Sequence, residues 1–98
     1  MRQFHVFRRA DGRLLLDLQS DRIDTPTRVV ALLTPAEEAR NDVPHLRPRF
    51  QIEGRSYILQ TTELAAVRRN ALPDEPLADL SEAGYVIQRA LDTLFSTV

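Results

Sequence analysis

The side chains that could do chemistry in this sequence are few, and the two histidines come first. His5 falls in an alternating segment and His45 in a polar one. A metal site built on two histidines also needs carboxylates at the right geometry, and an isolated histidine is more often an ordinary structural residue. The chain has no cysteine, which excludes thiolate sites, and all 13 basic residues are arginine, which excludes Schiff-base and P-loop lysines. We therefore expect no metal, no cofactor and no catalytic residue.

Three aspartates, Asp17, Asp21 and Asp24, lie close together in the sequence. Neighbouring carboxylates can shift one another's pKa and so supply an acid and a base. The alternative is structural, because aspartates in a turn hydrogen-bond the backbone, and Arg22 and Arg28 are at hand as ion-pair partners. No Ser-His-Asp order, nucleophile elbow or glycine-rich phosphate loop accompanies them. We favour the structural interpretation.

Arg47, Arg49 and Arg55 flank a predicted hairpin that carries Phe50 and Tyr57, a pattern that could face RNA. The whole chain, however, has 13 basic and 14 acidic residues and a formal charge of −1, so it has no general attraction for nucleic acid or an anionic membrane. A solvated arginine-rich face is the simpler interpretation. We expect neither nucleic acid nor membrane as a direct partner.

The length of the chain and its pattern of polar and apolar residues indicate the kind of domain that would position these residues. A chain of 98 residues fits one domain, which we expect to span 1–98. The segment Met1–Phe7 alternates polar and apolar side chains, which is not typical of a signal peptide. The longest apolar run, Val29–Leu33, is too short to cross a membrane. We expect a cytoplasmic protein.

Alternating or apolar segments bounded by turn residues predict a domain built mainly of strands. The predicted strands are Gln3–Phe7, Leu14–Leu18, Arg28–Leu33, Arg49–Glu53 and Ser56–Thr61. Turn signals at Ala10–Gly12 and Glu53–Gly54 join the first two and the last two strands as hairpins. The polar loop Gln19–Pro26 contains one apolar residue, Ile23, which either plugs the core or forms an exposed contact.

Two short segments are predicted to be helical. Thr34–Glu37 is typical of a helix start, with Thr34 as the N-cap and proline at the first helical position, although an edge hairpin would also fit residues 34–48. Thr62–Val67 is predicted to form a single helical turn.

The strongest pattern predicts an amphipathic C-terminal helix, N-capped by Asp79 or Ser81, with Asp79 and Glu82 resembling a capping box. One apolar stripe contains Leu80, Ala83, Ile87, Ala90, Leu91, Leu94 and Val98. The opposite face carries Tyr85, Arg89, Asp92 and Ser96, and Phe95 lies at the margin of the stripe. The fold class is therefore α+β, mainly β, with the helix packed on the sheet and its apolar end available to a partner.

Several of these segments resemble the CcdB family of toxins from bacterial toxin–antitoxin modules. The matching stretches are Gln3–Phe4, Leu16–Asp21, Ile23–Pro26, Thr61–Thr62, Ala65–Val67, Ala78–Ser81 and Leu94–Phe95 with three residues after it. The resemblance runs over nearly the whole chain, and the most specific part is Gln-Ser-Asp followed by Ile-Asp-Thr-Pro. It implies an SH3-like antiparallel barrel with a C-terminal helix, which forms a homodimer and serves plasmid maintenance.

The resemblance also implies that the protein works by binding and is not an enzyme. Family members insert into the A subunit of DNA gyrase and trap the cleaved DNA complex, until the antitoxin CcdA folds its disordered tail onto the toxin and displaces it. The gyrase contacts carried over to this chain are Ile23, Asp92, Phe95, Ser96, Thr97 and Val98. The antitoxin contacts carried over are Arg8, Arg13, Gln19, Ser20, Arg22 and Ile23.

The chain departs from the family pattern within these contacts. Ser96 and Thr97 stand where the family is best known for Trp-Gly, Asp92 stands in place of an amide, and Arg22 stands where Ile is frequent. A buried aromatic anchor commonly supplies several kcal/mol at an interface, so its loss would cost roughly 2–4 kcal/mol of binding unless the contact is rebuilt.

Two alternatives stay open at this point. The MazF and Kid endoribonuclease toxins share the fold, and such an activity would use Arg47 or Arg49 with an aspartate of the Asp17–Asp24 group, although no MazF-type signature is present. The other alternative is a CcdB homologue that keeps the antitoxin surface and no longer poisons gyrase.

Overall fold

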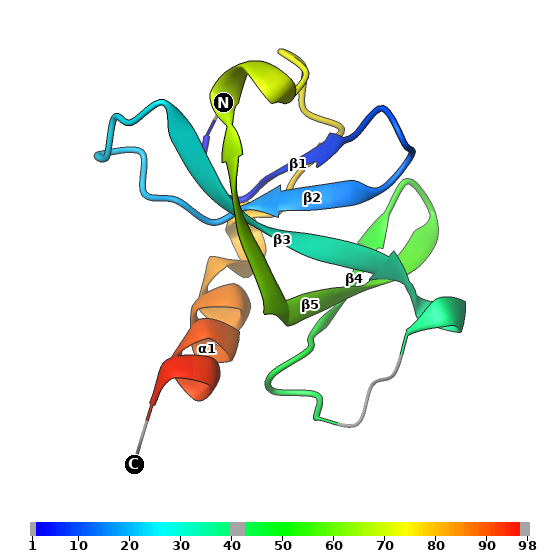
Figure 1. Cartoon of the computed structure of the whole chain (residues 1–98). Coiled ribbons are helices and arrows are strands. Elements are labelled where there is room, and N and C mark those ends of the chain that lie inside the picture. Colours follow the sequence, from blue (N-terminus) through cyan, green and yellow to red (C-terminus); the bar gives the residue numbers. More distant parts are fainter. Residues whose placement is uncertain (1, 40–42, 97–98) are drawn as a thin grey trace.

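The computed structural model describes residues 2–39 and 43–96. Within them, the strands are β1 (His5–Arg8), β2 (Leu14–Asp17), β3 (Thr27–Pro35), β4 (Arg49–Ile52), β5 (Arg55–Arg68) and β6 (Ala78–Asp79). The strands form one antiparallel sheet in the order β4-β5-β3-β2-β1-β6, which curls into a nearly closed barrel (Figure 1). One α-helix, α1 (Gly84–Phe95), lies against the barrel in the described part of the chain. The predicted mainly-β, α+β class is confirmed.

Both faces of β2 are buried, as its leucine-rich run predicts. Leu14 and Leu16 pack into the main core, which also contains Ile87 of α1. Leu15 points to the other side of the sheet, where it packs with Phe7 in a smaller core. The alternation of side chains along a strand thus places consecutive leucines in two separate clusters.

The prediction of a helical turn at Thr62–Val67 is wrong, because this segment is the second half of β5. It pairs with the first half of β3, with Ala65 opposite Val30 and Val67 opposite Arg28. The register shifts between Ala31 and Leu32, so a bulge bends the long strand pair there. Pairing with β3 satisfies the backbone of an alanine-rich segment whose local sequence favours helix.

The helix α1 begins later than predicted. Asp79 lies in β6, and its carboxylate accepts a hydrogen bond from the Ser81 N–H (2.9 Å) at the start of a 3-10 turn, Ser81–Ala83. In the described chain no side chain caps α1, so the predicted capping box does not form. At Gly84, where α1 begins, the backbone passes close to Phe4: a Cβ on Gly84 would lie 3.0 Å from Phe4 Cε2.

The amphipathic pattern of the helix is confirmed. Ile87 and Ala90 are fully buried, and the half-buried members of the predicted stripe are Leu80, Ala83, Leu91 and Leu94. Tyr85 on the opposite face is 79% exposed. Val98, the last predicted member, lies outside the described residues. No helix among the described residues is long and apolar enough to cross a membrane.

The segment after β3 forms a short helical turn. Thr34 belongs to β3 and is not an N-cap, and a 3-10 turn at Ala36–Glu38 follows Pro35 without a side-chain cap. Residues 40–42 of the predicted 34–48 segment lie outside the described residues. A further 3-10 turn, Arg69–Ala71, follows β5.

Candidate partner-binding surfaces

The loop between β2 and β3, Gln19–Pro26, is held in shape by one of its own side chains. Gln19 Nε2 donates hydrogen bonds to the carbonyl of Ile23 (3.2 Å) and to Thr25 Oγ1 (3.1 Å). Gln19 Oε1 accepts a hydrogen bond from the N–H of Val29 (3.1 Å), which lies beyond the far end of the loop. Gln19 therefore ties the two ends of the loop and its tip together.

A buried ion pair lies at the base of this loop. Asp17 in β2 is 0% exposed and Arg28 in β3 is 4% exposed. Arg28 Nε and Nη2 donate to the two carboxylate oxygens of Asp17 (2.8 and 3.1 Å), and Nη2 also donates to the carbonyl of Gln19 (3.0 Å). This bidentate geometry is what a buried pair needs to offset the desolvation of its charges. The predicted pairing of this aspartate group with Arg28 is confirmed.

Two other residues of the loop, Asp24 and Arg22, do not form the ion pairs that the sequence predicts. Asp24 Oδ1 lies 2.7 Å from Nη1 of Arg69, which begins the 3-10 turn directly after β5, so the loop is tied to a distant part of the chain. The side chain of Arg22 makes no hydrogen bond or ion pair within residues 2–39 and 43–96, and its predicted pairing with the aspartates is wrong. Its backbone N–H is held by Ser20 Oγ (3.2 Å).

The loop and the strand after it expose apolar side chains. Ile23 is 52% exposed, so it is an exposed contact and not a core plug. Val29 is 40% exposed and lies opposite Ala66 of β5, which is also exposed. Large apolar side chains that stay in solvent together mark candidate interaction surfaces.

The end of α1 carries another exposed apolar side chain, Phe95, which is 67% exposed. Asp92 is also exposed and accepts a hydrogen bond from Gln88 Nε2 (3.1 Å), while its carbonyl accepts one from the Ser96 N–H (2.7 Å). Thr97 and Val98, two of the predicted gyrase contacts, lie outside the described residues.

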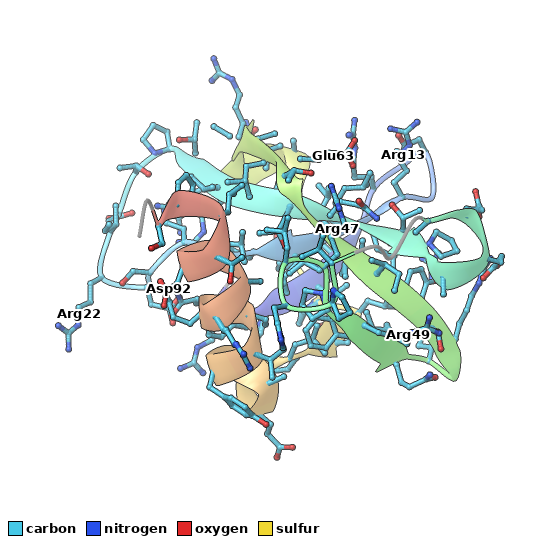
Figure 2. The ribbon with its side chains drawn as sticks, turned by 90° about the horizontal axis from the view of Figure 1, so that it is seen from below. Arg13, Arg22, Arg47, Arg49, Glu63 and Asp92 are labelled. Atoms are coloured by element: carbon cyan, nitrogen blue, oxygen red, sulfur yellow. The ribbon has the colours of Figure 1, made fainter. Side chains whose placement is uncertain are left out.

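Among the described residues, the predicted gyrase contacts divide between the loop Gln19–Pro26 and the end of α1. Figure 2 shows Arg22, in the loop, and Asp92, in the helix, on the same side of the molecule. Figure 1 shows that the loop and the end of α1 lie at opposite ends of that side. The loop that carries Ile23 and the helix end that carries Phe95 therefore lie apart in one chain.

An open groove of about 890 Å³ lies beside the β1–β2 hairpin. Its lining includes Arg8 and Arg13 from the hairpin, Arg47, and Tyr57 and Glu63 from β5. The labelled Arg13, Arg47 and Glu63 gather on this side in Figure 2. Such a groove combines guanidinium groups, which bind carboxylates bidentately, with one aromatic face.

Most of the charges at this groove are paired within the chain. Arg8 Nη2 lies 3.5 Å from Glu53 Oε1, and Arg55 contacts Glu37. The hydrogen bond from Arg55 lowers the pKa of Glu37, and the same bond raises the pKa of Arg55. Arg55 also lies 5.7 Å from the centre of the Tyr57 ring, a cation–π contact.

The two histidines lie in separate contacts. His5 Nε2 is 3.6 Å from Asp79 Oδ2, and His5 Nδ1 is buried without a hydrogen-bond partner among the described residues. His45 Nε2 lies 3.5 Å from Arg89 Nη2. In the part of the chain that the structure describes, no three histidine, aspartate or glutamate side chains come together as a metal site.

The residues of the ribonuclease alternative are not brought together. Arg49 and Arg22, a member of the aspartate-containing loop, lie at opposite sides of the molecule in Figure 2. Asp17 is fully buried and paired with Arg28, and Arg47 donates to Thr62 Oγ1 (3.3 Å). An acid–base pair between these arginines and this aspartate group has no geometric support.

The predicted antitoxin contacts fall into two groups at opposite ends of β2. Arg8 and Arg13 lie at the hairpin and line the groove. Gln19, Ser20, Arg22 and Ile23 lie in the loop at the other end of the strand (Figure 1).

The sequence indicates Arg47 and Tyr57 only as part of a pattern that could face RNA, and it does not indicate Val29 as an exposed residue. Arg47 and Tyr57 line the groove with Arg8 and Arg13, yet they come from segments whose placement depends on how β5 folds back. Val29 belongs to an apolar run that predicts burial. The bulge after Ala31 changes the phase of β3, so the sequence alone does not indicate that Val29 lies at an exposed position.

These features define a small antiparallel barrel with an exposed loop, an exposed helix end and a charged groove. The chain matches the family model described as CcdB protein over residues 3–97. It therefore belongs to the CcdB family, whose members are toxins of toxin–antitoxin systems.

Proposed function

We propose that this toxin, a single domain of residues 1–98, acts in the cytoplasm as a homodimer that binds the A subunit of DNA gyrase and traps the cleaved DNA complex. A CcdA-like antitoxin neutralises it. The toxin catalyses no reaction in this proposal. The family match over residues 3–97 is the observation that carries it.

The exposed apolar side chains support a gyrase contact made by Ile23 and Phe95. They are 52% and 67% exposed, and exposed large apolar residues are the usual anchors of a protein interface. Asp92 and Ser96 flank Phe95, and they give this surface a more polar character than the family's aromatic tail would.

A dimer would unite these separated contacts. Loop Gln19–Pro26 and the end of α1 lie at opposite ends of one side, with Val29 and Ala66 exposed on the strands next to the loop. An isologous dimer repeats the same patch about a two-fold axis, so each end of the side meets the opposite end of the partner. Ile23 of one protomer would then lie near Phe95 of the other, and the target would contact both protomers.

The division of the antitoxin contacts fits a partner that binds in extended form. Such a segment would reach from the groove at Arg8 and Arg13 to the loop at Arg22 and Ile23. A disordered chain that folds on binding can cover separated sites of this kind. Acidic residues in it would pair with the groove arginines.

Induced expression without antitoxin separates this proposal from its alternatives. We expect growth arrest with double-strand DNA breaks, and rescue by co-expression of the antitoxin. Arrest with intact DNA and cleaved RNA would favour the endoribonuclease. Normal growth at high expression would favour a homologue that binds antitoxin without poisoning gyrase.

A further inference from the structure

The buried ion pair holds more than the two strands that carry it. Arg28 Nη2 donates to the carbonyl of Gln19 (3.0 Å), and Asp17 Oδ1 accepts from the N–H of Gln19 (3.0 Å). Arg28 Nη2 also lies 3.7 Å from Asp21 Oδ1, the atom that accepts a hydrogen bond from the Gln3 N–H (2.7 Å). Both backbone polar groups of Gln19 are therefore fixed by the buried pair.

The fixed backbone directs the side chain of Gln19 across the loop. Its amide reaches the Ile23 carbonyl, Thr25 Oγ1 and the Val29 N–H, as described above. A continuous chain of hydrogen bonds thus runs from the buried Asp17 carboxylate to the backbone of Ile23. At its outer end, the side chain of Ile23 remains in solvent.

Strand pairing alone would not require these charges. Well-packed apolar residues of similar volume commonly hold two strands as well as a buried ion pair does, because the pair must offset its desolvation. What apolar side chains could not do is hold the N–H and the carbonyl of Gln19 at the same time. The charges at this position are therefore suited to defining the shape of the loop.

We propose that Asp17, Arg28 and Gln19 are positioning residues, which hold loop Gln19–Pro26 in the one conformation that presents Ile23 to a protein partner. The inference rests on the proposed function only in taking that partner to be gyrase. Preorganisation of this kind strengthens binding because the ordering of the loop is completed before the partner arrives.

The first test concerns the loop alone and needs no partner. In Gln19→Ala, the backbone 15N order parameters of residues 20–24 should fall from about 0.85 to below about 0.6, the ranges of rigid and flexible backbone. Gln51→Ala is the matched control, because Gln51 donates only to Ser56 Oγ in the β4–β5 hairpin. Unchanged order parameters in folded Gln19→Ala would overturn the inference.

The second test couples the loop to binding of the gyrase A subunit. Gln19→Ala should weaken binding about tenfold or more, in the range of an interface hot spot. In an Ile23→Ala background the same change should have little further effect, because Gln19 acts through Ile23. Additive losses would mean that Gln19 contacts gyrase directly and would overturn the positioning role.

The two tests fail in distinguishable ways. If the unchanged protein does not bind gyrase, the proposed target is wrong, and the order parameters alone decide whether the loop is preorganised. If Asp17→Asn folds, its order parameters can be measured too, and those of residues 20–24 should fall as they do in Gln19→Ala. A rigid loop in Asp17→Asn would show that the Asp17–Arg28 ion pair does not position the loop.

Discussion

At the scale of single residues, the main finding is that charged side chains form ion pairs inside the molecule as well as on its surface. Asp17 and Arg28 are buried together, and each satisfies the hydrogen-bonding groups of the other. The sequence indicates this pair because the two residues lie on predicted strands that the loop Gln19–Pro26 joins. It does not indicate Arg69 as the partner of Asp24, because that contact depends on the end of β5 returning to the loop.

Removing Arg28 should be strongly destabilising. Arg28→Met leaves the Asp17 carboxylate buried without its counter-charge, which commonly costs about 3–5 kcal/mol of the free energy of unfolding. Urea denaturation measures this loss. The double variant Asp17→Leu/Arg28→Met should be more stable than Arg28→Met, because it leaves no isolated charge. A double variant less stable than the single one would contradict this account.

Asp79 should make stability depend on pH in the acid range. Hydrogen bonds from Ser81 lower the pKa of its carboxyl below 3.8. A lowered folded-state pKa stabilises the fold above pH 3.8, and this contribution disappears as the pH falls through the lower value. Because the side chain is 55% exposed, we expect less than about 1 kcal/mol.

The measurement is urea unfolding of Asp79→Asn from pH 7 to pH 2. The variant should be less stable than the unchanged protein at pH 7, and the two should converge below about pH 4. Asp74→Asn, in an exposed loop, is the control and should show no such convergence. A constant difference across the pH range would show that the carboxylate charge is not involved.

At the scale of secondary-structure elements, the sequence predicts the strands in which polar and apolar side chains alternate. It does not predict the strands that form only through tertiary pairing. The five predicted strands exist; four have ends within two residues of the prediction, whereas β5 extends to Arg68 instead of Thr61. The prediction of helix for Thr62–Val67 is wrong because this segment is a strand only through its pairing with β3. β6 has two residues and forms by pairing with β1, so no local sequence pattern predicts it.

The helix α1 should be held mainly by its buried stripe. Ile87 is 0% exposed, so Ile87→Ala should cost about 2–5 kcal/mol by lost burial and the cavity left behind. Tyr85→Ala, on the exposed face of the same helix, should change stability by no more than about 0.5 kcal/mol. Thermal or urea unfolding of both variants checks this. Equal effects would mean that the helix does not pack as described.

At the scale of the whole molecule, the loop Gln19–Pro26 and the end of α1 lie apart in one chain (Figure 1). The sequence indicates Ile23 and Phe95 as contacts through a family resemblance. It does not indicate that the loop and the helix end that carry them lie apart, which follows from the path of the chain around the barrel (Figure 1). In the proposed homodimer, two-fold symmetry would bring contacts of the two protomers together.

The dimer should depend on the exposed strand face next to the loop. Val29→Glu puts a charge into this face, and we expect the variant to be a monomer with an unchanged fold, measured by sedimentation equilibrium and circular dichroism. Glu63→Gln alters a charge at the groove and should leave the dimer intact. A dimer that persists in Val29→Glu would place the interface elsewhere.

The central claim is that this toxin poisons gyrase despite its polar tail, and a gyrase cleavage assay tests it most directly. Purified toxin is titrated into gyrase, DNA and ATP, and linear DNA is measured for the unchanged protein, Phe95→Ala and Ser96→Trp. We predict cleavage by the unchanged protein, a loss in Phe95→Ala, and cleavage by Ser96→Trp at a concentration lower by about tenfold or more, because an aromatic anchor is restored. The absence of linear DNA with the unchanged protein, even in large excess, would contradict the account. The absence of linear DNA with Ser96→Trp in large excess would contradict it as well.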